Sequence, residues 1–307
     1  MNSKKTNNLI SVENAQEIIF SKFKKLETIK KKLIDSSGFI LEKEIKALFD
    51  LPNKNNSAMD GFAVRHEDLE PNKSLNVVGR VGAEAITDYV LKKDEALRIM
   101  TGSGIPEGAD SVVQFEKTNN NPHKGNDFPD SVIINETVKK GDNIRLSGQD
   151  YKFGETVVKG GMLIDPPIVG AIASFGINEV SVIRKPLVSV ISTGNELVIP
   201  GDKLKEGQIY DSNSFAISAA IKNSGADFKM HRILSDNKED VDKLYEDCSQ
   251  SDLIVTIGGV SKGDFDLIRD AISSKGSIDF WGINMKPGKP LAFGQVKIKG
   301  KNLFHIG

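Results

Sequence analysis

The chain has 307 residues, of which 38% are hydrophobic and 27% charged, and its formal net charge at pH 7 is −1. This length allows two or three domains, and the balanced charge argues against a dedicated nucleic-acid-binding protein, which usually has a basic face. Cys248 is the only cysteine, so a disulfide framework and a thiolate metal cluster are excluded. We find neither a signal-peptide core nor an apolar run of about 18 residues, which predicts a soluble, cytoplasmic protein without a membrane partner.

Residues 11–33 predict a helix at the start of the chain. Apolar side chains recur at helical spacing, at Val12, Ala15, Ile19, Phe23 and Leu26, and Ser11 is a candidate N-cap. The many lysines of this stretch could indicate an RNA- or lipid-binding run. Acidic residues are interleaved with them and no aromatic residues flank them, so we interpret them as a solvated helix face.

From about residue 50 to 145 the pattern changes to short β-type runs separated by Gly, Pro and Asn turns. The stretch 118–130 is polar and predicts the tip of a hairpin. This segment therefore suits a small β domain. The four clearest strands are expected at Leu75–Val81, Ala96–Met100, Ser111–Phe115 and Val132–Ile134.

After Pro186 the chain alternates between strands and helices, which predicts a doubly wound, mostly parallel sheet with ligands at the carboxyl ends of its strands. Helices are expected at 213–223, 238–249 and 265–274. Strands are expected at 187–192, 228–234, 252–257, 278–283, 291–296 and 302–306.

A glycine-rich loop follows the apolar strand 252–257. Backbone N–H groups at Gly258, Gly259 and Ser261 could close around an anion before the next helix. The carboxylates of Asp264 and Asp266 beside this loop suit Mg²⁺, which often bridges protein to phosphate. An ordinary strand–helix turn, with Asp264 as N-cap, explains the loop about equally well when the loop is considered alone.

Two other strand ends favour the functional interpretation over three unrelated surface turns. Residues 192–196 follow strand 187–192 and include the carboxylate of Glu196. Residues 284–290 follow strand 278–283 and carry Lys286 and Lys289 on a backbone stiffened by prolines. Such lysines suit an oxyanion or a phosphate, because each is a compact point charge.

Two segments of the β region also stand out. Residues 56–63 contain Asp60 before a glycine, and residues 100–110 contain Thr101 before another glycine. Taken separately, Asp60 is readily explained as a turn carboxylate and Thr101 as a strand-ending hydroxyl. Their role depends on the rest of the chain.

Six motifs together resemble, in the correct order, the signatures of the MoeA family of molybdopterin molybdenumtransferases, which includes the C-terminal domain of gephyrin. The resemblance extends over the chain from about residue 11. The motifs are NSAMDGFAV (56–64), IMTGSGIPEGAD (99–110), STGNEL (192–197), GQIYDSN (207–213), TIGGVSKGDFD (256–266) and MKPGKPLAFG (285–294).

The resemblance implies a multidomain α/β protein. It implies an N-terminal helix at 1–26, a linking domain at 27–50 and 143–180, an inserted β domain at 51–142 and an α/β molybdopterin-binding domain at 181–307. Family members continue beyond the position of Gly307 into a Leu-Pro-Gly-Asn-Pro loop and a C-terminal β domain. We therefore expect that domain to be absent and the chain to be shortened. The aromatic residue that usually precedes NSAMDG is also missing.

The resemblance further implies the insertion of molybdate into adenylated molybdopterin with release of AMP and with Mg²⁺ as cofactor. The implied partners are a second subunit, in a homodimer that shares the site, and the adenylyltransferase that supplies the substrate. The residues that match family site positions are Asp60, Asp150, Glu196, Asp236 and Asp266 as catalytic acids, the last three also as metal ligands, and Thr101, Gly258, Gly259, Ser261, Lys286 and Lys289 as substrate-binding residues.

The expected mechanism is positioning and charge neutralisation. We expect no Ser–His or Cys–His arrangement, because Cys248 lies in a predicted helix away from every motif. Two alternatives remain. A molybdopterin adenylyltransferase would carry a GGTG-type loop in place of GGVS, and a non-catalytic, gephyrin-like scaffold would have no need of the acids and the lysine pair.

Overall fold

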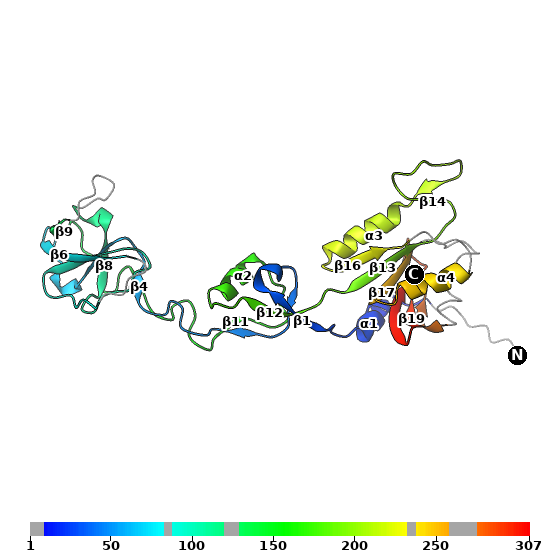
Figure 1. The fold of residues 1–307 in the computed structure, drawn as a ribbon, viewed down its shortest axis with the longest axis horizontal. Coiled ribbons are helices and arrows are strands. Elements are labelled where there is room, and N and C mark those ends of the chain that lie inside the picture. The colour runs from blue at the N-terminus through cyan, green and yellow to red at the C-terminus, as the bar shows by residue number, and fades with distance from the viewer. Residues whose placement is uncertain (1–8, 83–87, 120–128, 232–237, 258–274) are drawn as a thin grey trace. The chain divides into compact units, whose positions relative to one another are not determined.

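The computed structural model describes residues 9–82, 88–119, 129–231, 238–257 and 275–307. The chain forms two units: Met1–Glu42 together with Glu179–Gly307, and Lys43–Asn178. The second unit is thus inserted between the two halves of the first (Figure 1). Among the described helices, none is long and apolar enough to cross a membrane. The four-part domain division expected from the resemblance stays a prediction.

The first unit contains a six-stranded sheet in the order β16-β13-β17-β20-β19-β18. Neighbours β16, β13, β17 and β20 run parallel, whereas β19 is antiparallel to both β20 and β18. The α/β prediction is therefore confirmed, but the sheet is mixed. The short β19–β20 connection explains this, because adjacent strands joined by a tight turn pair antiparallel. The strands are β13 (Leu187–Ser192), β16 (Asp227–Met230), β17 (Leu253–Ile257), β18 (Gly276–Trp281), β19 (Ala292–Ile298) and β20 (Lys301–Ile306).

Helices cover both faces of this sheet. Helix α4 (Lys238–Asp247) contributes Leu244 and Tyr245 to a buried cluster with Ile254 and Leu303. Helix α1 (Val12–Lys22) packs Ala15 against Phe280 and Phe293. Successive side chains of a strand point to opposite faces, so the alternation of Leu303 and Phe304 along β20 places α4 and α1 on opposite sides. A third helix, α3 (Ser212–Asn223), precedes β16. The expected helix 265–274 lies outside the described residues.

The prediction of one helix over 11–33 was wrong in its second half. Helix α1 begins after the N-cap Ser11, whose side chain accepts a hydrogen bond from Asn14 N at 3.1 Å, and it ends at Lys22. Residues Thr28–Lys32 form strand β1, which pairs with β12 (Glu179–Ile183). Pairing with a strand from a distant part of the chain overrides the local helical pattern, a tertiary effect that spacing along the sequence does not register.

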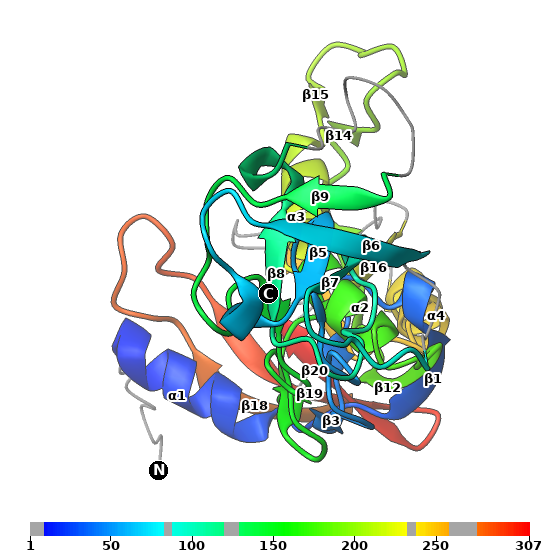
Figure 2. The same ribbon diagram turned by 90° about the vertical axis from the view of Figure 1, so that its left-hand side faces the viewer.

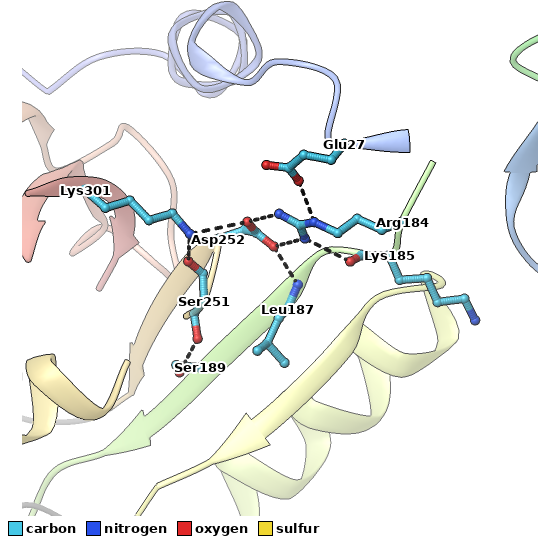
Figure 3. Close-up of polar contacts among 8 residues, drawn as sticks. All are labelled: Glu27, Arg184, Lys185, Leu187, Ser189, Ser251, Asp252 and Lys301. Carbon is cyan, nitrogen blue, oxygen red and sulfur yellow. Dashed lines mark hydrogen bonds and ion pairs between the residues drawn. The ribbon is translucent and has the colours of Figure 1, made fainter. Parts of the chain in front are cut away.

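An ion-pair network, the Arg184 clamp, ties this β1-β12-β2 sheet (β2, Ile40–Leu41) to the start of the six-stranded sheet (Figure 3). The Arg184 guanidinium donates to both carboxylate oxygens of Asp252, at 2.6 and 2.8 Å, and to Glu27 at 2.6 Å. Asp252 also accepts from Leu187 N at 2.9 Å, and Lys301 donates to Ser251 O at 3.0 Å. The outgoing chain at Glu27 and the returning chain at Arg184 are therefore joined to each other and to β13 and β17.

The second unit is built around a five-stranded sheet in the order β8-β5-β7-β6-β9 (Figure 2). Buried hydrophobic clusters lie on both faces of this sheet. Four of its strands agree with the predicted runs. They are β6 (Ser74–Val81), β7 (Glu95–Ile99), β8 (Ser111–Gln114) and β9 (Ser131–Ile133), and the fifth is β5 (Gly61–Val64).

Each unit also contains smaller elements. The second unit has two strand pairs, β4 (Asn56–Ser57) with β10 (Ile144–Arg145) and β3 (Ile45–Lys46) with β11 (Thr156–Val158). It also has helix α2 (Pro166–Ala173) and short 3₁₀ turns at His66–Asp68 and Phe115–Lys117. The first unit has the parallel pair β14 (Leu197–Val198) with β15 (Ile209–Tyr210) and a 3₁₀ turn at Leu33–Asp35.

Candidate functional site

The carboxyl ends of β13 and β17 lie side by side at one edge of the six-stranded sheet. Ser192 and Ile257 are register partners, and Thr193 N donates to Ile257 O at 3.0 Å. The two loops that the sequence singled out, after residue 192 and after residue 257, therefore leave the sheet from neighbouring strands. Ligands of open α/β sheets bind at this kind of edge.

Glu196 lies on the first of these loops, directly over Gly194. Gly194 has φ +141°, and a Cβ atom at this position would lie 2.7 Å from both carboxylate oxygens of Glu196. Glycine thus permits both the backbone conformation and the close approach of the carboxylate. The Glu196 side chain is exposed, and within the described residues it has no ion-pair or hydrogen-bond partner. It is available to bind a metal or a substrate.

Asp211 fixes the base of this loop, a role that our sequence analysis did not assign. Its buried carboxylate accepts from Ser192 Oγ at 2.6 Å, from Ser214 Oγ at 2.5 Å and from Ser214 N at 3.1 Å. Burial opposes ionisation of Asp211, but these three hydrogen bonds outweigh burial and lower its pKa. The carboxylate joins the last residue of β13 to the N-terminus of α3. Its position before Ser-Asn-Ser was the available signal, because Asp is a preferred N-cap.

Lys286 and Lys289 lie on the loop that follows β18. Ile283 N donates to Lys289 O at 3.0 Å, which closes this loop, and both lysine side chains are exposed. Neither ammonium group has an ion-pair partner among the residues described. The pair can therefore attract an anion.

The lysine loop and the Glu196 loop share one edge of the sheet but are not adjacent. Strand β18 runs in the same direction as β13, because it is antiparallel to β19, which is antiparallel to β20. Strands β17, β20 and β19 lie between them, and at about 4.8 Å for each strand this separation is roughly 19 Å. An extended ligand, and not a single small ion, would be needed to span both.

In the second unit, the structure joins Asp60 and Thr101 directly. Asp60 Oδ1 accepts from Thr101 N at 2.6 Å and from Thr101 Oγ1 at 2.8 Å, and both residues are exposed. These hydrogen bonds lower the pKa of Asp60. The carboxylate is thus ionised at neutral pH and held in one orientation by the end of β7.

Two of the motifs and a third segment of the second unit converge through backbone hydrogen bonds. Ser57 N donates to Ser103 O at 2.9 Å, and Ala58 N donates to Asn143 O at 2.9 Å. Gly61 is required here, because a Cβ atom would lie 2.1 Å from Val113 O on the neighbouring strand. The segments around residues 57, 103 and 143 therefore form one substructure.

Asp150 belongs to the third of these segments. Its carboxylate pairs with the guanidinium of Arg145, and its backbone N donates to Leu51 O at 2.9 Å. No hydrogen bond joins Asp150 to Asp60 or Thr101 in the described structure.

The remaining site candidates, Asp236, Gly258, Gly259, Ser261 and Asp266, lie outside the described residues, as does Asp264. Over the ranges that are described, no group of three or more His, Cys, Asp or Glu side chains is arranged to hold a metal ion. Glu196 is the one proposed metal ligand that the structure places.

The expectation that no Ser–His or Cys–His arrangement exists was wrong. His231 Nε2 lies 2.8 Å from Ser189 Oγ and 3.6 Å from Cys248 Sγ, and Ser189 Oγ lies 2.7 Å from Ser251 Oγ. These residues are far apart in sequence and meet only through the sheet. Ser189 and Cys248 are fully buried, and burial raises the pKa of the thiol, so this cluster lacks the exposed, activated nucleophile of a covalent enzyme.

Comparison with known proteins finds two family matches along the chain. Residues 10–176 match the MoeA N-terminal region (domain I and II), and residues 189–306 match a probable molybdopterin binding domain. The chain is 36% identical over 306 residues to a molybdopterin molybdenumtransferase of Staphylococcus epidermidis, which covers 97% of this chain and 70% of the relative. It is also 36% identical over 266 residues to the Haemophilus influenzae protein of that name, covering 86% of this chain and 64% of the relative.

The fold agrees with these sequence matches. The crystal structure of the molybdopterin biosynthesis MoeA protein from Pyrococcus horikoshii superposes with a TM-score of 0.75 at 32% identity, covering 97% of this chain and 74% of that one. The chain belongs to the MoeA family of molybdopterin molybdenumtransferases, enzymes of molybdenum cofactor biosynthesis.

Proposed function

We propose that this protein inserts molybdate into adenylated molybdopterin and releases AMP. The observation that carries the proposal is the carboxyl edge of the six-stranded sheet, where Glu196, Lys286 and Lys289 are exposed and, in the part of the chain that is described, have no charged partner. Unpaired charges of both signs at this edge suit a substrate that bears phosphate and oxyanion groups and is bound with a cation.

In this proposal the chain's own residues bind and orient the reactants. Lys286 and Lys289 bind the substrate phosphate or molybdate as point charges. The backbone of Gly258, Gly259 and Ser261 binds the phosphoanhydride. Asp60, held by Thr101, and Asp150, held by Arg145, supply oriented carboxylates from the second unit. Catalysis then results from positioning and from stabilising charge on the leaving AMP.

We further propose that Glu196, Asp236 and Asp266 hold Mg²⁺. The fit of Glu196 rests on its exposed carboxylate, whose oxygens both face the space above Gly194 and are the hard ligands that Mg²⁺ prefers. When bound, Mg²⁺ would neutralise charge on the phosphate oxygens.

We also propose that the site is shared between the two subunits of a homodimer. The Asp60 carboxylate in one unit, whose Oδ1 is held by Thr101, and the Glu196 carboxylate in the other are both exposed. Mixing Asp60→Asn subunits with Glu196→Gln subunits tests this idea. Restored activity in the mixture supports shared sites, whereas additive residual activities contradict them.

The decisive experiment is anaerobic, molybdate-dependent AMP release from adenylated molybdopterin with Mg²⁺. We expect Glu196→Gln to lower the rate roughly 100-fold, because an oriented charge at the reacting centre is lost. Glu206→Gln is the matched control, since Glu206 is also an exposed glutamate on the segment between β13 and α3. Its rate should equal that of the wild type, and chelation of Mg²⁺ should stop the wild-type reaction.

Other outcomes identify the alternatives. Formation of adenylated molybdopterin from ATP, without molybdate-dependent AMP release, would indicate an adenylyltransferase. Failure to bind adenylated molybdopterin at all would contradict the transferase proposal and favour a gephyrin-like scaffold.

A further inference from the structure

Two arginines of the second unit lie side by side, and neither forms an ion pair with a residue that the structure describes. Arg80 on β6 and Arg98 on β7 are register partners in a parallel strand pair, so their side chains leave the same face of the sheet. Like charges at directly opposed positions destabilise a sheet. Such a pair lowers the stability of the fold unless another group neutralises the two positive charges.

The other arginines that the structure describes all form ion pairs. Arg65 pairs with Glu67 and Asp68, Arg145 with Asp150, and Arg184 with Asp252 and Glu27. Of the five arginines in the described ranges, only Arg80 and Arg98 lack an ion pair and a side-chain hydrogen bond. Their donors are therefore available to a ligand.

Arg98 is also held in place by aromatic packing. Its guanidinium carbon lies 5.1 Å from the centre of the Phe115 ring, a cation–π geometry. Phe115 in turn packs edge-on against Phe62, with ring centres 5.4 Å apart, and Phe62 is the register partner of Arg98 on β5. Arg98 is half-buried, so the orientation of its guanidinium is restricted before any ligand binds.

This arginine pair belongs to the same rim as the candidate site residues Asp60 and Thr101. Asp60 immediately precedes β5, and its carbonyl oxygen accepts from Phe115 N at 3.2 Å. Thr101 follows β7, three residues after Arg98. Hydrogen bonds from Thr101 lower the pKa of Asp60, and the charge of Arg98 adds to the effect, which indicates that Arg98 is near the carboxylate.

We propose that Arg80 and Arg98 bind a tetrahedral oxyanion of the substrates, either molybdate or the phosphate of the adenylated molybdopterin. This inference rests on the proposed function and adds two contact residues to it. Guanidinium groups suit the task, because their planar fork donates two parallel hydrogen bonds to such oxygens. An anion between the two side chains would also remove their mutual repulsion.

The test measures equilibrium binding of sodium molybdate and, separately, of inorganic phosphate and AMP to the full chain. We expect Arg98→Gln to weaken binding of the cognate anion roughly 10- to 100-fold, because charge-assisted hydrogen bonds are lost. Arg80→Gln, a more exposed position, should weaken it less. A loss confined to molybdate identifies molybdate as the occupant, whereas a loss for phosphate and AMP identifies the nucleotide phosphate.

Two further variants keep the result interpretable. Lys159→Gln removes a positive charge from an exposed position of the same unit and should bind like the wild type. Arg98→Lys keeps the charge but loses the fork, so it should bind with intermediate affinity and serves if Arg98→Gln does not fold.

The inference would be overturned if both arginine variants kept the wild-type affinity for every anion and the wild-type KM for adenylated molybdopterin. A wild-type chain that releases no AMP but still binds anions through Arg98 would instead count against the proposed function alone.

Discussion

The two ends of the six-stranded sheet differ in whether their charged side chains form ion pairs. At the amino ends of β13, β17 and β20, every charge of the Arg184 clamp has a partner, and Asp252 accepts three hydrogen bonds from Arg184 and Leu187 (Figure 3). At the carboxyl ends, Glu196, Lys286 and Lys289 have no such partner within the described residues. Paired charges stabilise the fold, whereas unpaired charges at the candidate site remain available to a ligand. This difference distinguishes the amino end of the sheet, which has a structural role, from the carboxyl end, where the candidate site lies.

The largest expected effect on stability comes from breaking the Arg184 clamp at the amino ends of the strands. Asp252→Ala leaves the partly buried Arg184 without its main partner and should lower the free energy of unfolding by about 3 kcal/mol. AMP release by folded protein should be unchanged, because the clamp lies at the opposite end of the sheet from the candidate site. Chemical denaturation and the AMP assay measure the two effects.

Glu27→Gln is the control for this prediction, because Glu27 is solvent-exposed and contributes only a surface ion pair to the same arginine. Its stability should stay close to that of the wild type. A large loss of AMP release by folded Asp252→Ala protein would contradict the separation of the two ends.

A smaller effect is expected from Asp211, where scaffold and site meet. Asp211→Ala removes the N-cap of α3 and leaves the Ser192 hydroxyl without its acceptor, which should cost about 2 kcal/mol of stability. AMP release should also fall, because the Glu196 loop begins after Ser192.

Asp165→Ala provides the comparison, since Asp165 caps α2 by accepting from Ile168 N at 3.0 Å. That variant should lose about 1 kcal/mol and keep its activity. Equal losses of activity in both variants would show that Asp211 acts through global stability only.

The smallest expected effect on the free energy of unfolding is that of mild acid, between pH 7 and 5.5, on a histidine in the middle of the sheet. His305 on β20 is fully buried beside Tyr245, neither ring nitrogen has a hydrogen-bond partner among the described residues, and burial lowers its pKa to about 3. The folded chain keeps the ring neutral, while the unfolded chain binds a proton below about pH 6.5. This contribution to stability is therefore complete well above pH 6.5 and declines as the pH falls towards 3. Over the upper part of this range, from pH 7 to 5.5, the loss is about 1.3 kcal/mol.

Replacing the histidine checks this assignment. His305→Leu should flatten the dependence of stability on pH in this window, although the half-buried His231, whose pKa burial also lowers, should leave a residual slope. An unchanged slope would show that His305 does not control the response to acid.

The sequence predicted most of the regular elements, because their signals are local. Strand Leu187–Ser192 was predicted at its observed bounds, and α3 begins one residue earlier than expected, at Ser212. The strand at Thr28–Lys32 was missed, because its pairing with Glu179–Ile183 depends on residues about 150 positions away in the chain. Periodicity along one segment carries no information about such partners.

The candidate site divides in the same way. Glu196, Lys286 and Lys289 were predictable, because loops after parallel strands gather at one edge. Asp211, Arg80 and Arg98 were not identified, since their significance lies in their contacts: two buried serines for Asp211, and for the arginines the absence of an ion pair with any described residue. The contact between Ser189, His231 and Cys248 also required the folded sheet.

The insertion of one unit within the other also has a consequence for synthesis on the ribosome. Ala15 of α1 packs against Phe280 and Phe293, which are translated only after the entire second unit. The second unit is continuous in sequence and can fold as it emerges, whereas the apolar face of the helix stays uncovered until β18 and β19 have been made. Nascent chains halted before β18 should therefore bind chaperones through α1 and release them once β18 and β19 have emerged.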